Sequence, residues 1–272
     1  MAYTLKLFDE PLLDFEMASK GRDLIVEVTY VHAGSLTKLP PDWESVKDAD
    51  SLPDDLAKDL ASWLARRSIP ANRTYVSNFL AKLGLSEHDV EGIIRICKGL
   101  SLNDCFWVVE SRDPSTFAKS NLYDNPFSRI VSRIAFTGSG SSRRRSFYST
   151  PELTTNGALA KCWRRIDGEI FLFKEGTTGA RNTGNEPLSE FYAAQVAQAM
   201  GIAHIPYVPT KWNGHFCSKC PLFTSKDTGF VSAGRLVREG GIDAVRAYYR
   251  RLGSVYAEAF ADMIVFDAVA YN

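Results

Sequence analysis

The sequence predicts an α+β fold built around an antiparallel sheet, and two local patterns support this. The dipeptide Asp167-Gly168 separates two extended segments, residues 161–165 and 169–174, which is the strongest hairpin signal in the chain. A helical pattern over residues 187–200 follows, with Pro187 in its first turn and Gly201 directly after its end. Strands joined by a tight turn pair antiparallel. We therefore expect an antiparallel sheet with this one helix packed against it.

The composition is typical of a soluble globular protein. The chain has 272 residues, 45% of them apolar and 24% charged, and its 32 Lys and Arg residues balance its 32 Asp and Glu residues. A protein that coats nucleic acid would carry a basic excess, so we expect no direct contact with nucleic acid. No apolar run approaches the roughly 18 residues of a membrane span, and no leader pattern begins the chain. We therefore expect a cytoplasmic protein without a membrane partner.

The cysteines indicate a reducing compartment. There are five of them, an odd and scattered set: Cys97, Cys105, Cys162, Cys217 and Cys220. The segment 217–220 is a single C-x-x-C pattern, whereas structural zinc needs four ligands. We therefore favour free thiols over a zinc site and assign no metal ligand.

Residues 1–115 are predicted to form a small module of mixed helices and strands. Alternating apolar and polar residues, or short apolar runs, predict strands over residues 3–8, 24–30 and 102–109. The proline-containing residues 38–55 are expected to form a loop. Three short helices are predicted: residues 55–66, a helix from the N-cap Asn72 to near Gly84, and one from Ser86 to Gly99.

Residues 116–230 and 231–272 are expected to form two further parts. Residues 137–150 form a Gly- and Ser-rich loop with the run Arg143-Arg144-Arg145, interpreted as a solvated loop or as an anion-binding or regulatory segment. Glycine-rich segments follow the hairpin at residues 176–179 and 182–185, and residues 222–231 are expected to be extended. The last part is predicted to be helical over residues 242–252 and 256–270.

Lys174 and Glu190 are the residues most indicative of chemistry. Lys174 ends an apolar strand, and a lysine that continues a buried strand is unusual without a partner. On the helix, at about 100° per residue, Glu190 lies among alanines and opposite an apolar stripe of Leu188, Tyr192, Val196 and Ala199. Alone, Glu190 is typical of an exposed helix position. Together the two residues predict an ion pair, in the order of parts found in the nucleotide-binding lobe of kinases.

Several segments together resemble the HipA-like serine/threonine kinases, bacterial relatives of the toxin of the HipA/HipB pair. The resemblance rests on residues 154–161, 171–174, 189–191 and 197–201. Residues 220–224 are similar to the hinge strand of that family, and residues 260–272 to the helix that leads into its catalytic loop. The match is best over residues 150–272, and the first part looks like the N-terminal module of a HipA-like subgroup.

The resemblance implies a kinase-like nucleotide-binding lobe at residues 116–230, with an antiparallel sheet and one helix. The mixed module of residues 1–115 would precede it, and the first helices of a C-terminal lobe would follow at residues 231–272. ATP is the implied cofactor, with Lys174 at its phosphates and Glu190 as the partner of that lysine. The loop covering the phosphates would contain Thr154, Thr155, Asn156, Gly157 and Lys161, and the adenine would lie against Pro221, Leu222 and Phe223.

One departure from the family lies at the end of the sequence. The family continues beyond its equivalent of Asn272 with a catalytic aspartate and two Mg²⁺ ligands. We therefore assign no catalytic residue within the chain, expect this chain alone to be inactive, and expect Mg²⁺ only where the C-terminal segment is present. The implied partners are a protein substrate and a DNA-binding antitoxin-like protein. The alternatives are an inactive truncated relative with an interaction or regulatory role, and an unrelated small-molecule-binding domain.

Overall fold

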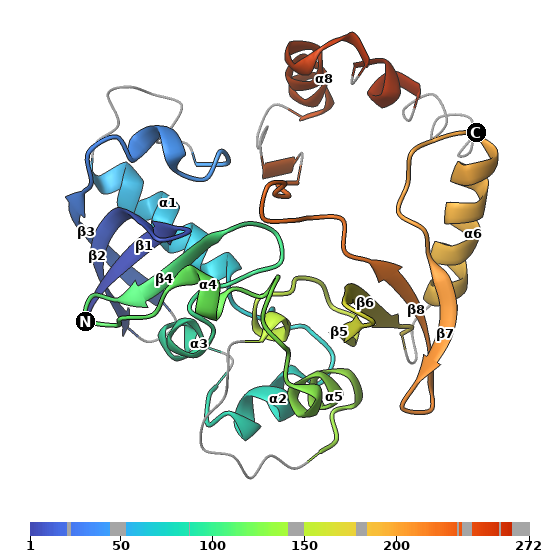
Figure 1. The fold of residues 1–272 in the computed structure, drawn as a ribbon, viewed down its shortest axis with the longest axis horizontal. Coiled ribbons are helices and arrows are strands. Elements are labelled where there is room, and N and C mark those ends of the chain that lie inside the picture. The colour runs from blue at the N-terminus through green and yellow to red at the C-terminus, as the bar shows by residue number, and fades with distance from the viewer. Residues whose placement is uncertain are drawn as a thin grey trace. The chain divides into compact units, whose positions relative to one another are not determined.

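The computed structural model describes residues 1–20, 23–43, 53–86, 88–140, 150–177, 184–232, 234–235, 241–255 and 257–262. By its internal contacts the chain divides into two compact units (Figure 1). The first comprises Met1–Leu39 and Glu44–Gly229, and the second comprises Pro40–Trp43 and Phe230–Asn272. The basic run Arg143-Arg144-Arg145 and the glycine-rich residues 178–183 lie outside the described residues.

The first sheet is antiparallel, with the strand order β3-β2-β1-β4. Its strands are β1 (Ala2–Leu7), β2 (Glu10–Lys20), β3 (Asp23–Val31) and β4 (Phe106–Glu110). The sequence analysis missed β2. Its pairing with β1 skips Leu12, because Leu5 pairs with Leu13 and Lys6 with Pro11. This bulge buries two successive leucines and breaks the alternation by which a strand is recognised.

Short helices follow β3 and connect to β4. They are η1 (Leu36–Lys38), α1 (Pro53–Arg66), α2 (Val76–Lys82) and α3 (Val90–Cys97). The predicted starts of two helices were wrong. The N-cap of α2 is Tyr75, at φ +65°, and not Asn72, which lies in a turn. The N-cap of α3 is Asp89 and not Ser86, because the Asp89 carboxylate accepts the Gly92 N–H at 2.8 Å.

The second sheet confirms the predicted antiparallel arrangement, with the strand order β5-β6-β8-β7. Its strands are β5 (Lys161–Ile166), β6 (Glu169–Glu175), β7 (Val208–Trp212) and β8 (His215–Pro221). The predicted β5–β6 hairpin turns at Asp167 and Gly168, both at positive φ. The predicted helix is α6 (Glu186–Ala199), which packs on this sheet and is followed by Gly201 at φ +69°.

The prediction of extended structure at residues 222–231 was wrong. No strand is present there; the extended segments are β7 and β8, which form a second hairpin just before it. That hairpin turns at Asn213 and Gly214, both at positive φ. Asn-Gly is the pair that such a turn favours, so the sequence contained a signal for these two strands.

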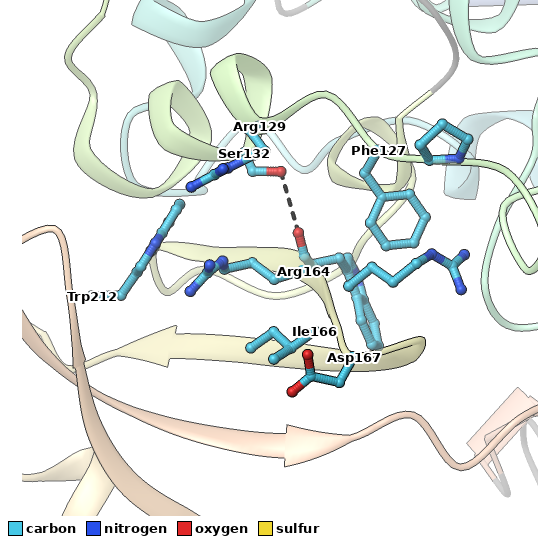
Figure 2. A pocket seen from close by; sticks show the side chains of 10 residues that line it. Phe127, Arg129, Ser132, Arg164, Ile166, Asp167 and Trp212 are labelled. Carbon is cyan, nitrogen blue, oxygen red and sulfur yellow. Dashed lines mark hydrogen bonds between the residues drawn. The ribbon is translucent and has the colours of Figure 1, made fainter.

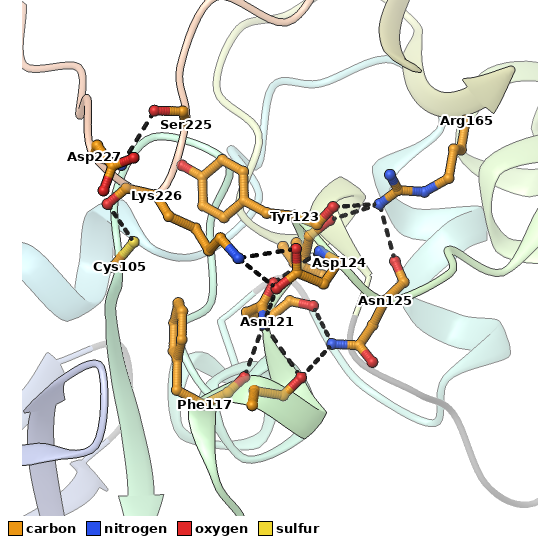
Figure 3. A network of polar contacts seen from close by, with 12 residues as sticks. Cys105, Phe117, Asn121, Tyr123, Asp124, Asn125, Arg165, Ser225, Lys226 and Asp227 are labelled. Atoms are coloured by element: carbon orange, nitrogen blue, oxygen red, sulfur yellow. Dashed lines mark hydrogen bonds and ion pairs between the residues drawn. The ribbon is translucent and has the colours of Figure 1, made fainter. Parts of the chain in front are cut away.

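A polar network holds the chain after β8 (Figure 3). Lys226 forms an ion pair with Asp124 at 3.0 Å, and its carbonyl accepts a contact from the Cys105 thiol at 3.4 Å. Asn121 supports Asp124 by donating to its carboxylate from the side-chain amide. The segment that follows the last strand is therefore fixed to the turn after α4 (Phe117–Ser120).

The two faces of the second sheet belong to different cores. Trp163 and Ile170 join a cluster with Leu100, Leu102 and Trp107 of the preceding module. On the other face, Cys162, Phe173 and Cys217 pack with Phe136 of α5 (Arg129–Thr137). Residues of both predicted parts share the first cluster, so the N-terminal module does not have a core of its own in this region. The boundary at residue 115 stays a prediction.

In the second unit, the predicted helix is present as α8 (Gly241–Leu252). Of the predicted helix at residues 256–270, residues 257–262 are helical and the others lie outside the described residues. Among the helices of the described residues, none is both long and apolar enough to cross a bilayer.

Candidate functional site

One rung of the second sheet carries three polar side chains in a row. Lys161 of β5 lies opposite Lys174 of β6, and Lys174 lies opposite Ser218 of β8. Residues directly opposite on paired strands project from the same face of a sheet. The three side chains therefore share the face to which Glu190 of α6 also reaches.

Lys174 and Glu190 form the predicted ion pair. The second carboxylate oxygen of Glu190 accepts a hydrogen bond from the Ser218 hydroxyl, and the Tyr207 hydroxyl lies 3.0 Å from the Lys174 ammonium. The lysine and glutamate side chains are 16% and 26% exposed. Burial alone would lower the pKa of Lys174, but its hydrogen bonds with Glu190 and Tyr207 raise that pKa above the ordinary value. Lys174 is therefore a fixed and permanently charged group.

The packing of α6 explains how Glu190 reaches the sheet. The buried residues of this helix are Pro187 and Ala194, so the alanine side carrying Glu190 faces inward. The apolar stripe lies outward instead, with Tyr192 62% and Val196 47% exposed. Small side chains allow the helix to approach closely enough for a direct ion pair.

Lys161 is the second cation of this site and is only 7% exposed. Its ammonium donates to the Asn156 carbonyl at 2.9 Å, and none of the described carboxylates lies within ion-pair distance of it. Burial, reinforced by the positive charges of Arg73 and Lys174, lowers the pKa of Lys161 to about 8. The site thus holds two lysine cations and one carboxylate, that of Glu190, which leaves an excess of positive charge.

The loop at residues 154–157 lies against Lys161. Its two threonine hydroxyls are used within the fold: Thr154 donates to the Leu100 carbonyl at 2.8 Å, and Thr155 donates to Pro151. Gly157 has φ +100°, and a Cβ added there would lie 2.3 Å from the Lys161 ammonium. Any ligand contact of this loop would therefore come from its backbone and from the exposed Asn156, not from the threonine hydroxyls.

Arg73 fixes this loop and was not recognised as a site residue from the sequence. Its buried guanidinium donates to the carbonyls of Glu152, Thr155 and Lys161, on both sides of the loop. The next residue, Thr74, donates from its N–H to the Ala158 carbonyl at 2.8 Å. Burial lowers the pKa of Arg73 to about 10, an effect that the nearby Glu152 opposes. The sequence offers no local signal for this role, since Arg73 lies some eighty residues earlier.

The segment proposed for adenine begins where β8 ends. Pro221 has no N–H, and the Leu222 N–H donates to the Ile170 carbonyl at 2.8 Å. The Leu222 side chain packs against the first core cluster, whereas Phe223 is exposed. Of the three residues, only Phe223 presents its side chain to solvent, and the adenine contact stays a prediction.

The C-x-x-C pattern lies on β8, where it cannot chelate a metal. Cys217 pairs with Glu175 and Cys220 with Leu172, so the two thiols project from opposite faces of the sheet. All five cysteines are buried and free of disulfides. Within the described residues, no three His, Cys, Asp or Glu side chains form a group that could hold a metal ion.

Comparison with known proteins gives similarity in structure but none in sequence. No protein-family profile matches the chain, and no curated protein is similar to it in sequence. The chain is similar to HipA of Shewanella oneidensis MR-1, seen in its complex with HipB and operator DNA. The similarity covers 81% of this chain and 50% of that protein, at 12% identity and a TM-score of 0.49. The chain spans about half the length of that protein. A likeness at this level carries no conclusion about ligand, activity or partner.

Tyr207 and Ser218 also escaped the sequence analysis. Both were missed because β7 and β8 were not predicted. The Asn213-Gly214 pair could have revealed the hairpin of β7 and β8, but only the pairing of β8 with β6 places Ser218 beside Lys174. Tyr207 immediately precedes β7, and only the tertiary structure brings it to Lys174.

Proposed function

We propose that the face of the second sheet carrying Lys161 and Lys174 binds the phosphates of ATP, as part of a HipA-like serine/threonine protein kinase. The observation that carries the proposal is the placement of two largely buried lysines on one rung, of which only Lys174 is paired with a carboxylate, that of Glu190. Like charges directly opposite each other on a sheet are destabilising, and burial adds to the cost. A bound polyanion would compensate both effects.

The residues of the site fit a nucleotide phosphate chain. Lys174, oriented by Glu190, would contact the phosphates as a fixed cation. Lys161 would add a second cation, and the close approach of Gly157 to it leaves no room for a side chain at that position. The Leu222–Phe223 segment follows the end of the strand that carries Ser218, about 13–17 Å along at roughly 3.3 Å per residue. It would receive the adenine.

ATP, when bound, supplies the phosphoryl group for transfer to a serine or threonine of a protein substrate. The substrate and a DNA-binding antitoxin-like partner follow from the sequence resemblance and belong to this proposal. Mg²⁺ requires oxygen ligands, chiefly carboxylates and phosphates, and we assign it none of the described side chains.

Calorimetric titration with ATP tests the proposal. We expect Lys174→Met and Lys161→Met each to weaken ATP binding about tenfold or more, because each removes a charge-assisted contact. Lys219→Met is the matched control. Lys219 neighbours Ser218 on β8, but its ammonium lies 5.0 Å from the Phe171 ring on the other face of the sheet. Equal affinities for all four proteins would refute the site.

A second reading, an interaction or regulatory protein without catalysis, is favoured by the exposed apolar stripe on α6. Tyr192, Val196 and Met200 are each exposed by nearly half or more of their surface. Radiolabelled ATP, offered to this chain extended by a HipA-like C-terminal segment, separates the two readings. Transfer of label by the extended protein that depends on Lys174 supports the kinase, whereas nucleotide binding without transfer supports the interaction protein.

A further inference from the structure

A separate cavity lies at β5, an edge strand of the second sheet (Figure 2). It lies between α5, β5 and β7 and has a volume of about 440 Å³. That volume is within the roughly 300–1,000 Å³ of small-molecule sites. Its lining combines aromatic, aliphatic and cationic side chains, among them Phe127, Arg129, Arg164, Ile166 and Trp212.

Two guanidinium groups converge in this cavity. The Arg164 guanidinium lies 5.1 Å from the Phe173 ring and 5.0 Å from the Trp212 ring. Figure 2 shows Arg129 and Arg164 both pointing toward Trp212. Within the described part of the chain, neither guanidinium is hydrogen-bonded or paired with a carboxylate, and the acidic lining residue, Asp167, pairs with neither. Each guanidinium carries five donors, so the cavity holds unused capacity for an anion.

Two other polar residues of the lining, Arg165 and Ser132, are engaged in contacts within the fold. Arg165 donates to the carbonyls of Leu122, Tyr123 and Asn125 (Figure 3). The Ser132 hydroxyl is bound to Glu152 and to the Trp163 carbonyl. These contacts make a rigid wall, and they leave the anion-binding role to Arg129 and Arg164.

Two further features add positive potential at the same place. Arg129 is the first residue of α5 and lines the cavity, so the positive end of that nine-residue helix lies close to it. An adjoining cavity of about 300 Å³ shares Arg129 and Trp212 and adds Arg133. Arg133 also forms no ion pair with a described residue.

We infer that this cavity, here called the arginine pocket, binds the phosphate of a small phosphomonoester. Guanidinium groups bind phosphate through paired N–H donors, and two of them match the double negative charge of such a group. The volume exceeds that of a phosphate alone, and Trp212, Phe127 and Ile166 provide apolar walls for a ring-bearing body. The inference does not depend on the proposed ATP site, because Lys161, Lys174 and Glu190 do not line this cavity.

Titration with three probes tests the arginine pocket: phenyl phosphate, inorganic phosphate and phenol. We expect phenyl phosphate to bind most tightly, inorganic phosphate more weakly, and phenol not at all. Binding should change the tryptophan fluorescence, and Trp212→Phe should reduce that change, with the remainder coming from Trp163, which also lines the cavity. If inorganic phosphate binds as tightly as phenyl phosphate, or if none of the probes saturates in the millimolar range, the inference is overturned.

Variants locate the binding. Arg129→Gln and Arg164→Gln should each weaken phenyl phosphate binding about tenfold, since each removes a charge-assisted pair of hydrogen bonds. Arg129 is exposed on the surface of α5, so its variant remains informative if Arg164→Gln unfolds. Arg95→Gln, an exposed arginine paired with Glu110, and Lys174→Met should bind as the wild type does. Loss of binding in Lys174→Met, or unchanged binding in Arg129→Gln, would place the anion elsewhere and overturn the inference.

Discussion

Lys161 and Lys174 lie directly opposite each other across β5 and β6, and both project from the face on which Glu190 lies. Glu190 pairs with Lys174 alone, and Lys161 is held by the backbone carbonyl of Asn156. The different environments give the two lysines opposite pKa shifts, upward for Lys174 and downward for Lys161. Lys174 is therefore held in its protonated form, whereas the protonation of Lys161 depends on its surroundings.

The lowered pKa of Lys161 predicts a pH-dependent stability. In the folded state it loses its proton near pH 8, and in the unfolded chain near its ordinary value of 10.5. Between these values the unfolded state binds more protons, so the free energy of unfolding rises with pH. Below about pH 8 this contribution is constant and unfavourable. Relative to Lys161→Met, the wild type should gain about 3 kcal/mol across the window.

Urea unfolding of both proteins, from about pH 7 to about pH 10.5, measures this difference. Other titrating groups affect both proteins equally and cancel. Two stability curves that stay parallel across this range would show that Lys161 does not titrate there.

Removal of the Glu190 charge should destabilise the fold. Glu190→Gln leaves the Lys174 ammonium largely buried without a counter-charge, and we expect a loss of about 1–3 kcal/mol. The double variant Lys174→Met/Glu190→Gln should recover part of that loss, because no buried charge remains. Chemical denaturation of the single and double variants measures both effects, with Glu169→Gln at an exposed position of β6 as the control. A double variant less stable than Glu190→Gln would contradict this account.

Arg73 should be irreplaceable by lysine. Arg73→Lys keeps the charge but loses the fork that reaches three carbonyls at once, so we expect destabilisation of about 2–4 kcal/mol. Hydrogen exchange at residues 153–160 should also accelerate, because the loop loses its anchor. Arg95→Lys, at an exposed ion pair, should change stability by no more than about 0.5 kcal/mol. Unchanged exchange in the loop would show that Arg73 does not hold it.

Substitution of Gly157 should have two effects, backbone strain and a steric clash with Lys161. The same substitution at Gly168 produces the backbone strain alone. Gly157→Ala strains the backbone at φ +100° and brings a methyl group against the Lys161 ammonium. Gly168→Ala, at φ +88° with open space around it, brings backbone strain alone. Both should cost about 1–2 kcal/mol of stability, measured by denaturation. Only Gly157→Ala should also weaken ATP binding, and equal ATP affinities for the two variants would argue against a phosphate loop at this position.

The sequence by itself determined the elements whose signals are local. The hairpin follows from the turn preference of Asp167-Gly168, and the helix follows from Pro187 at its start and Gly201 after its end. The ion pair follows because a buried lysine such as Lys174 is rarely without a partner, here Glu190. Strand β2 was missed because a bulge at Leu12 removed its alternation. The cap of α3 was misplaced because Ser86 and Asp89 are both good caps.

Only the tertiary structure decided what surrounds the two lysines. Arg73 comes from a bend before α2, Tyr207 from the residue before β7, and Ser218 from the middle of β8. Arg129 and Arg164 meet at Trp212, although the three residues belong to three separate elements. Sequence periodicity reports which side of an element is buried, but not which element covers it. Which element covers a buried side is decided by the packing of the whole unit, because the energy of each contact depends on partners distant in the chain.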